Sequence, residues 1–156
     1  MRSPKSFYSD AATKSALTSK LLSTSVHRTN RPMHRTRGHW ASCSGSMEVQ
    51  DANPLERARK ELHEETGFTE NEVTLIRSGN VQVLVDETIN TKWIIHPFLF
   101  QLKSPEFESR MQINWEHTEF KWINPKELSA YQTVPSLVET LDRVLHASSH
   151  DTKGGE

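Results

Sequence analysis

The chain has 156 residues, a length that fits one domain with a modest hydrophobic core. Charged residues make up 25% and hydrophobic residues 34%, which is typical of a soluble globular protein. No apolar run approaches the ~18 residues that a membrane span needs, so we expect no membrane partner. The single cysteine, Cys43, excludes an internal disulfide framework and fits a reducing compartment, and no Cys/His spacing predicts zinc.

The net charge of −1 hides an uneven distribution. Residues 1–39 hold eight of the 19 Lys and Arg but only one acidic residue, Asp10. Such a segment is typical of a mitochondrial transit segment, an arm that contacts polyanions, or a solvated tail. Only "ALTSKLL", residues 16–22, is apolar enough to predict a short element there. We interpret residues 1–25 as a disordered or targeting-like basic arm. The acidic remainder predicts no specific nucleic-acid partner, and we expect a cytoplasmic protein, with mitochondria as the alternative.

The pattern changes near Trp40. The run "HWASCSGSMEV" predicts a short strand broken by Gly45. A helix is then predicted from Pro54 to Thr66. Asn53 is a good N-cap, Glu56 completes a capping-box-like pattern, and Gly67 ends the helix.

Strands and helices follow without strict alternation. Four apolar or β-branched runs predict strands at 73–77, 81–85, 92–102 and 118–123. The sequence "NPKEL" predicts a short helix, residues 134–145 a closing amphipathic helix, and residues 148–156 a tail. This order favours an α+β or layered α/β domain over a doubly wound sheet.

Three carboxylates crowd the last turns of the predicted helix in the stretch "KELHEETGF". With ~3.6 residues per turn, Glu61, Glu64 and Glu65 fall within roughly 100° of one another. Like charges at this spacing repel, and they lie at the negative end of the helix dipole. One interpretation is a solvated face with Arg57 paired to Glu61 and Lys60 to Glu64. The other is a site for a hard divalent cation, which prefers oxygen ligands.

The flanking residues bear on this choice. The stretch 45–68, "GSMEVQDANPLERARKELHEETGF", resembles the Nudix box, G-x5-E-x7-R-E-U-x-E-E-x-G-U, in which U is bulky and apolar. Asp51 stands in place of the first glutamate, with one extra residue before the second half. Lys60 replaces the arginine, and a lysine lacks the bidentate fork that orients a glutamate. The residues that match directly are Gly45, Glu61, Leu62, Glu64, Glu65, Gly67 and Phe68.

The resemblance covers residues 26–147 and implies a Nudix-like α/β/α sandwich with a mixed β-sheet. The segments "WEHTEFKWINPKEL" and "TVPSLVETLDRVL" are similar to a Nudix subgroup found in fungal proteins. In that subgroup the Nudix domain precedes an initiation-factor-2B-like or sugar-phosphate-isomerase-like domain. The apolar opening strand of the family is hard to find in the present sequence.

The resemblance also implies a Mg²⁺- or Mn²⁺-dependent pyrophosphohydrolase, which cleaves the acid anhydride of a nucleoside diphosphate derivative. Glu61, Glu64 and Glu65 would be metal ligands, and one of them, Glu116 or Glu119 would be the general base. The remaining candidates are Gly45 and Glu116 for the metal, Glu119 for catalysis, and Lys60, Trp40 and Arg37 for the substrate. The competing interpretations are that Glu116 and Glu119 are surface acids beside Lys121 and that Gly45 belongs to a strand-end turn. For Trp40 the competing interpretation is packing in the core or at its rim.

A second hypothesis is a binding module of the same fold. It would hold a nucleotide or sugar phosphate without turnover, as a regulatory part of an initiation-factor-2B-like or isomerase-like system. Either hypothesis predicts a small nucleotide-like ligand and leaves a homodimer open.

Overall fold

The computed structural model describes residues 5–8, 20–28, 39–112, 120–123, 125–134 and 137–146. Its strands are β1 (Lys5–Tyr8), β2 (Lys20–Arg28), β3 (Cys43–Ser46), β4 (Val73–Ser78), β5 (Gln82–Asp86), β6 (Thr91–Leu102) and β7 (Phe120–Ile123). Its helices are α1 (Pro54–Thr66) and α2 (Leu137–Leu145), with 3-10 turns η1 (Glu87–Ile89), η2 (Pro105–Arg110) and η3 (Pro125–Ala130). In this described part, no helix has the length and apolar character needed to cross a bilayer.

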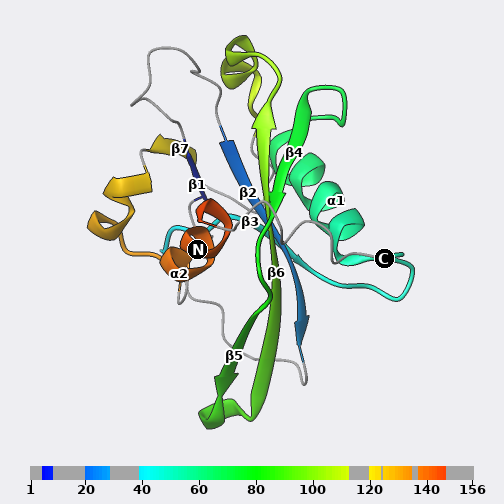
Figure 1. Ribbon diagram of the computed structural model, residues 1–156, viewed down its shortest axis with the longest axis vertical. Helices are drawn as coiled ribbons and strands as arrows, with labels where there is room; N and C mark the ends of the chain where they lie inside the picture. The colour runs from blue at the N-terminus through cyan, green and yellow to red at the C-terminus, as the bar shows by residue number, and fades with distance from the viewer. Residues whose placement is uncertain are drawn as a thin grey trace.

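The long strand β6 organises one mixed sheet (Figure 1). One side of β6 is antiparallel to β4 near its end and to β5 near its start, and the other side is antiparallel to β2. Strand β2 also pairs in parallel with β3 and antiparallel with β1, and β1 pairs in parallel with β7. The mixture of parallel and antiparallel pairs confirms the predicted mixed sheet.

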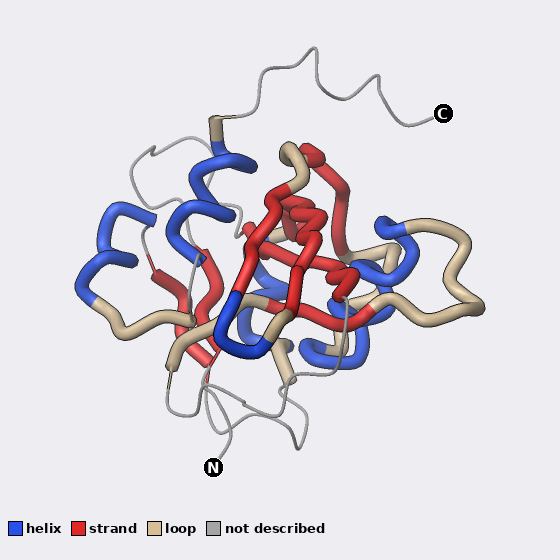
Figure 2. Tube along the Cα trace, turned by 90° about the horizontal axis from the view of Figure 1, so that it is seen from below, coloured by secondary structure: helices blue, strands red, loops and turns tan. Residues whose placement is uncertain are grey.

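The two faces of β6 enter different hydrophobic clusters. Phe98, Phe100 and Leu102 join the cluster beneath α1, whereas Leu99 joins the cluster beneath α2. Alternate residues of a strand point to opposite faces, so these assignments place the helices on opposite sides of the sheet. The end-on view of Figure 2 likewise shows strands between helical segments. The α/β/α sandwich is confirmed.

Helix α1 begins and ends where its sequence predicts. The Asn53 side chain accepts a hydrogen bond from the Glu56 amide at 2.9 Å, and Pro54 occupies the first turn. Glu56 reaches back to the Ala52 amide at 2.6 Å, one residue before the N-cap, so the predicted capping box is formed in a shifted version. Gly67 is left-handed, with φ of 79°, and donates to the His63 carbonyl.

The N-terminal region differs from the predicted basic arm. Residues 5–8 form β1, and residues 20–28 form β2, which pairs with β6 over nine residue positions. The prediction of an arm without sheet strands is therefore wrong for these residues. The sequence does not indicate these strands clearly, because their Ser, Thr and Lys residues interrupt the apolar alternation that predicts a strand. The predicted domain limits, 26–147, and the tail stay predictions.

Candidate functional site

A polar cavity of about 690 Å³ lies between strand β3, the loop after it and the side of α1. Strand β3 supplies Gly45 to the lining of this cavity. Helix α1 supplies two cationic side chains, Arg57 and Lys60, and two anionic ones, Glu61 and Glu64. The residues that line it are Ser44, Gly45, Ser46, Glu48, Gln50, Arg57, Lys60, Glu61 and Glu64. Since α1 packs directly on β2 and β3, these side chains are held by two packed elements of secondary structure.

Because Gly45 has no side chain, the side chain of Glu61 can lie directly against strand β3. A Cβ built on Gly45 would overlap the Oε1, Cδ and Cγ atoms of Glu61. The carboxylate of Glu61 therefore occupies the space that any other residue at position 45 would fill. This close approach explains physically why a glycine is needed in the middle of β3, and it places Gly45 against Glu61, two of the residues predicted for the metal site.

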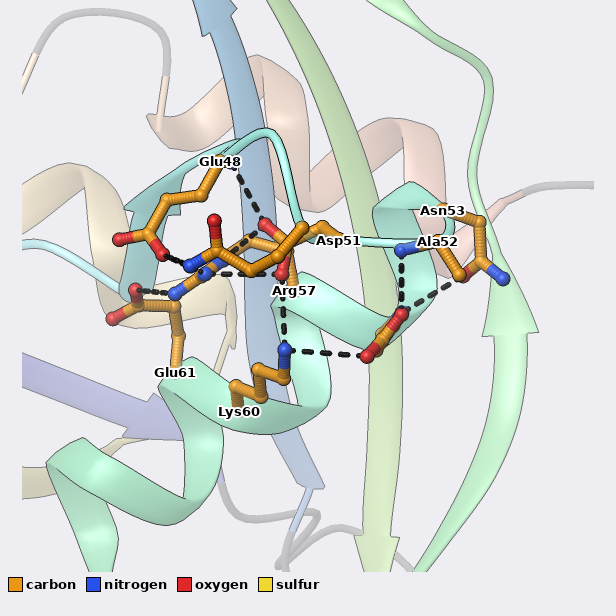
Figure 3. A network of polar contacts seen from close by, with 9 residues as sticks. Glu48, Asp51, Ala52, Asn53, Arg57, Lys60 and Glu61 are labelled. Carbon is orange, nitrogen blue, oxygen red and sulfur yellow. Dashed lines mark hydrogen bonds and ion pairs between the residues drawn. The ribbon is translucent and has the colours of Figure 1, made fainter.

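Arg57 is the centre of the polar network in Figure 3. Its guanidinium binds Asp51 through two hydrogen bonds, Nε to Oδ2 at 2.7 Å and Nη2 to Oδ1 at 3.0 Å. It also pairs with Glu48 at 2.8 Å and with Glu61 at 3.2 Å. Arg57 and Asp51 are both buried, and such bidentate charge-assisted pairs are the strong ones. The hydrogen bond from Arg57 holds the pKa of Asp51 far below its usual range.

Lys60 pairs with two carboxylates, and neither is that of its predicted partner, Glu64. Its Nζ lies 3.1 Å from Asp51 and 3.2 Å from Glu56, so the predicted Lys60–Glu64 ion pair is wrong. The loop folds back over α1 and brings Asp51 closer to Lys60 than sequence spacing indicates. The hydrogen bonds to Asp51 and Glu56 raise the pKa of Lys60. The Lys60 side chain is still 41% exposed, and it borders the cavity.

The three clustered glutamates occupy different environments. Glu64 is exposed in the cavity wall, Glu61 is 13% exposed beside Arg57, and Glu65 is buried beneath them. Burial, together with the charges of Glu65 and Glu64, raises the pKa of Glu61 to about 7 despite the ion pair to Arg57. Of the three glutamates predicted on one side of the helix, Glu61 and Glu64 line the cavity, whereas Glu65 is buried outside its lining.

A family comparison bears on this geometry. The model of the NUDIX domain matches residues 22–144, most of the chain. The chain belongs to the Nudix family. A search of curated proteins finds no match. Nudix membership supports hydrolysis of nucleoside diphosphate derivatives in general, with a small nucleotide-like substrate, and Nudix hydrolases generally use divalent metal ions.

Within this Nudix domain, the remaining predicted site residues are partly placed. Trp40 packs edge-on against Tyr131, with ring centroids 5.8 Å apart, and bonds to the backbone of Gln132 and Val134. It lies outside the lining of the cavity, so its predicted stacking on a nucleobase gains no support. Arg37, Glu116 and Glu119 lie outside the described residues, and their roles stay predictions.

Sequence reasoning missed the organising role of Arg57. The Nudix resemblance directs attention to Lys60, which replaces the motif arginine and lacks a bidentate fork. In this chain Arg57 supplies that fork, one helical turn earlier, and directs it at Asp51. The signal in the sequence was the spacing of four between Arg57 and Glu61, which predicted the observed pair but not its burial.

Proposed function

We propose that this Nudix domain is a divalent-metal-dependent hydrolase that cleaves the diphosphate linkage of a nucleoside diphosphate derivative. The observation that carries the proposal is the cavity in which Glu61 and Glu64 face Arg57, Lys60 and the backbone of Gly45. Its volume of about 690 Å³ lies within the range of small-molecule sites. Its wall offers carboxylate oxygens for a cation and an exposed amine for a phosphate.

The cavity supplies two carboxylates, Glu61 and Glu64, of the kind that a hard divalent cation prefers, while no three His, Cys, Asp or Glu side chains of the described residues converge on one metal position. Glu61 and Glu64 line the cavity together, and the negative charge of Glu64 and Glu65 opposes ionisation of Glu61. A Mg²⁺ or Mn²⁺ ion would relieve that repulsion, because both ions prefer carboxylate oxygens. Glu61 and Glu64 would hold the ion, with Glu65 and the Gly45 backbone as further candidates. When bound, the metal would neutralise phosphate charge and lower the pKa of the attacking water.

The protein's own side chains would position the reacting groups. Arg57 fixes Glu61 from one side while Gly45 fixes it from the other, so the carboxylate has little freedom. Lys60, anchored by Asp51 and Glu56 but still exposed, would contact a phosphate oxygen. The general base would be one of the clustered glutamates or Glu119.

The alternative function is a Nudix module that binds a nucleotide or sugar phosphate without turnover. Its motivation is that Glu61, a proposed ligand, already bonds to Arg57, so part of its charge is compensated internally. The resemblance to the fungal initiation-factor-2B-like subgroup belongs with this alternative and stays a prediction. The two functions share one cavity and differ in whether a bond is broken.

A substrate panel separates the two functions. Nucleoside diphosphate derivatives are incubated with the protein and Mg²⁺ or Mn²⁺, and phosphate-containing products are measured. We expect turnover that stops with excess chelator and falls by at least about 100-fold in Glu64→Gln, since a lost metal ligand removes transition-state charge stabilisation. Glu127→Gln, an equally exposed glutamate outside the cavity, is the matched control and should keep parent activity.

Thermal melting tests ligand binding without turnover. Saturating Mg²⁺ should raise the melting temperature of the parent and of Glu127→Gln, but much less that of Glu64→Gln, because binding to the native state alone stabilises it. Turnover that survives chelation contradicts the metal mechanism. A Mg²⁺- or nucleotide-dependent shift without products across the panel favours the binding module.

A further inference from the structure

Strand β5 leaves one edge of the sheet open. Among the described strands, β5 is hydrogen-bonded only to β6, in an antiparallel ladder from Gln82↔Ile95 to Asp86↔Thr91. Figure 1 shows the β5–β6 hairpin extending away from both α1 and α2. An exposed edge strand offers a row of unpaired backbone groups to another strand. The described β5 contains no proline, and its ladder has no bulge that would block such pairing.

The side chains of this edge are also apolar. Val83 and Val85 of β5 are 51% and 65% exposed and share one face because they alternate along the strand, and Val81, directly before the strand, is 44% exposed. Three valines in a row on an open edge are unusual on a monomer, since edge strands are normally protected by charge, proline or irregular backbone. The row marks a surface suited to strand addition.

The backbone indicates which residues could pair across the edge. The Val81 carbonyl accepts a hydrogen bond at 3.1 Å from Arg143 of α2, so it points away from β6. Backbone groups alternate sides along a strand, and therefore those of Val83 and Val85 also face the open edge. An antiparallel partner centred opposite Leu84 would pair Val83 with Val85 in both directions.

The two ends of the open edge carry opposite charges, so the basic end of one copy is complementary to the acidic end of another. Arg143 stands beside Val81 at one end, where it also pairs with Glu139 at 3.1 Å, and the acidic residues Asp86 and Glu87 stand at the other end. In an antiparallel pair centred on Leu84, Glu87 of one copy lies opposite Val81 of the other, beside its Arg143. A parallel pairing would instead place like ends together. An antiparallel pair related by a two-fold axis therefore brings the valines of both copies together and places opposite charges beside each other.

We propose that β5 is a self-association surface, through which two copies of this chain join their sheets antiparallel about Leu84. The occupant of the open edge is a second copy of the same chain. This inference is independent of the proposed hydrolysis, because the cavity residues do not include β5.

Sedimentation velocity across a wide concentration range tests the proposal. The parent should dimerise reversibly, and Val83→Lys should raise the dimer Kd by roughly 100-fold, because two lysines would enter the pairing. Val85→Lys is a second variant with the same expectation, and thermal melts of both verify folding. Val138→Lys is the matched control, since Val138 is 50% exposed on α2 and lies outside the edge.

Cross-linking tests the register. Directly opposed residues in a non-hydrogen-bonded antiparallel pair lie about 4.5 Å apart at Cα, within reach of a disulfide. Leu84→Cys should therefore form a disulfide-linked dimer on mild oxidation, and Val138→Cys should not. The native Cys43 is buried and should not interfere.

Four outcomes would overturn the proposal. They are a parent that is monomeric throughout the range, a dimer that survives both lysine variants, and equal dissociation by Val138→Lys. The fourth is a dimer that Leu84→Cys fails to cross-link, since it excludes antiparallel pairing about this residue. Hydrolysis should be the same in parent and Val83→Lys, so a failure of either proposal is visible without the other.

Discussion

Helices α1 and α2 cover opposite faces of one sheet but bury different chemistry. Helix α1 buries Arg57 and Glu65 beside Ala58 and Leu62. Helix α2 buries mainly apolar side chains, and its one buried polar residue, Thr140, donates a hydrogen bond to Gln82 of β5. Both helices dock on the same scaffold, so the difference reflects what each helix does rather than where it lies.

The comparison indicates which face carries the function. Buried ion pairs cost desolvation free energy and often stabilise a fold no more than apolar groups of similar volume would, whereas apolar burial stabilises directly. Helix α2 has the composition that stability alone would favour. Helix α1 keeps a buried arginine and repelling glutamates, a departure from local rules that is expected at a functional site. Perturbing the two helices should therefore have different consequences.

The largest expected effect comes from removing the strand beneath α1. Deleting residues 1–25 removes β1 and most of β2, which lies between β6 and β3 and contacts α1. We expect the truncated chain to lose cooperative unfolding, because its core would be opened along the sheet. Circular dichroism with thermal melting measures this, with a deletion of residues 148–156 as control. A truncated protein that melts like the parent would show that β1 and β2 are dispensable.

Replacing Arg57 should be the most destabilising single change in the network. Arg57→Ala leaves the side chains of Asp51 and Glu61 without their main cation, at an expected cost of about 3–5 kcal/mol. Arg143→Ala on α2 removes an exposed pair to Glu139 and should cost at most about 1 kcal/mol. Urea denaturation gives both values. Equal losses would contradict the view that α1 depends on buried charge.

Adding a methyl group at Gly45 should lower activity more than stability. In Gly45→Ala the new Cβ would overlap the carboxylate and Cγ of Glu61, so Glu61 must move away from its ion pair with Arg57, and the free energy of unfolding should fall by about 1–3 kcal/mol. A misplaced catalytic group can cost about 100-fold in rate, and we expect a loss of that size in kcat. Ser46→Ala, at a neighbouring cavity position, is the control. A normal kcat in Gly45→Ala would remove Glu61 from the mechanism.

The predictability of α1 from sequence differs from that of its surroundings. Local signals gave its limits correctly, because Asn53, Pro54 and Gly67 act on the backbone within a few residues. The strands β4 to β7 were also predicted, since apolar and β-branched runs are local patterns. The helix α2 begins at Leu137 rather than at residue 134.

Features that depend on distant partners were not predictable in the same way. Strand β2 is polar in composition and becomes a strand through pairing with β6 and β3. The contact of Lys60 with Asp51 spans nine residues and requires the loop to fold back. Helical spacing does separate the two glutamates, because Glu65 follows Leu62 by three residues and Ala58 by seven and so continues the buried stripe, whereas Glu64 lies beside it and is exposed. Burial follows from how α1 docks, and docking is a tertiary property.

The free energy of unfolding should depend on pH because folding raises the pKa of Glu61. Its pKa rises from the ordinary 4.5 to about 7 on folding, so the folded state binds more protons between these values. Stability should therefore fall as the pH rises from about 4.5 to about 7 and stay low above that, by at most about 3 kcal/mol. Glu61→Gln should lose this slope. Urea denaturation at pH 5 and pH 8 measures it, and Glu127→Gln should retain the parent slope; an identical slope in Glu61→Gln would contradict the assignment.

The smallest expected effect concerns the start of α1. The Asn53 side chain accepts the Glu56 amide, so Asn53→Ala leaves one amide of the first turn without its cap, at a cost of about 1 kcal/mol. Ser104 precedes η2 without a side-chain cap, and Ser104→Ala should change stability by a few tenths of a kcal/mol at most, roughly the scale of ordinary surface changes. The cap also orients Glu56, which anchors Lys60. If α1 is built for its site, Asn53→Ala should therefore raise KM for the substrate as well as lower stability, whereas Asn53→Asp, which keeps the acceptor, should do neither. Denaturation and steady-state kinetics of the three variants separate a purely structural cap from one that also positions the lysine; an unchanged KM in Asn53→Ala would assign the cap to stability alone.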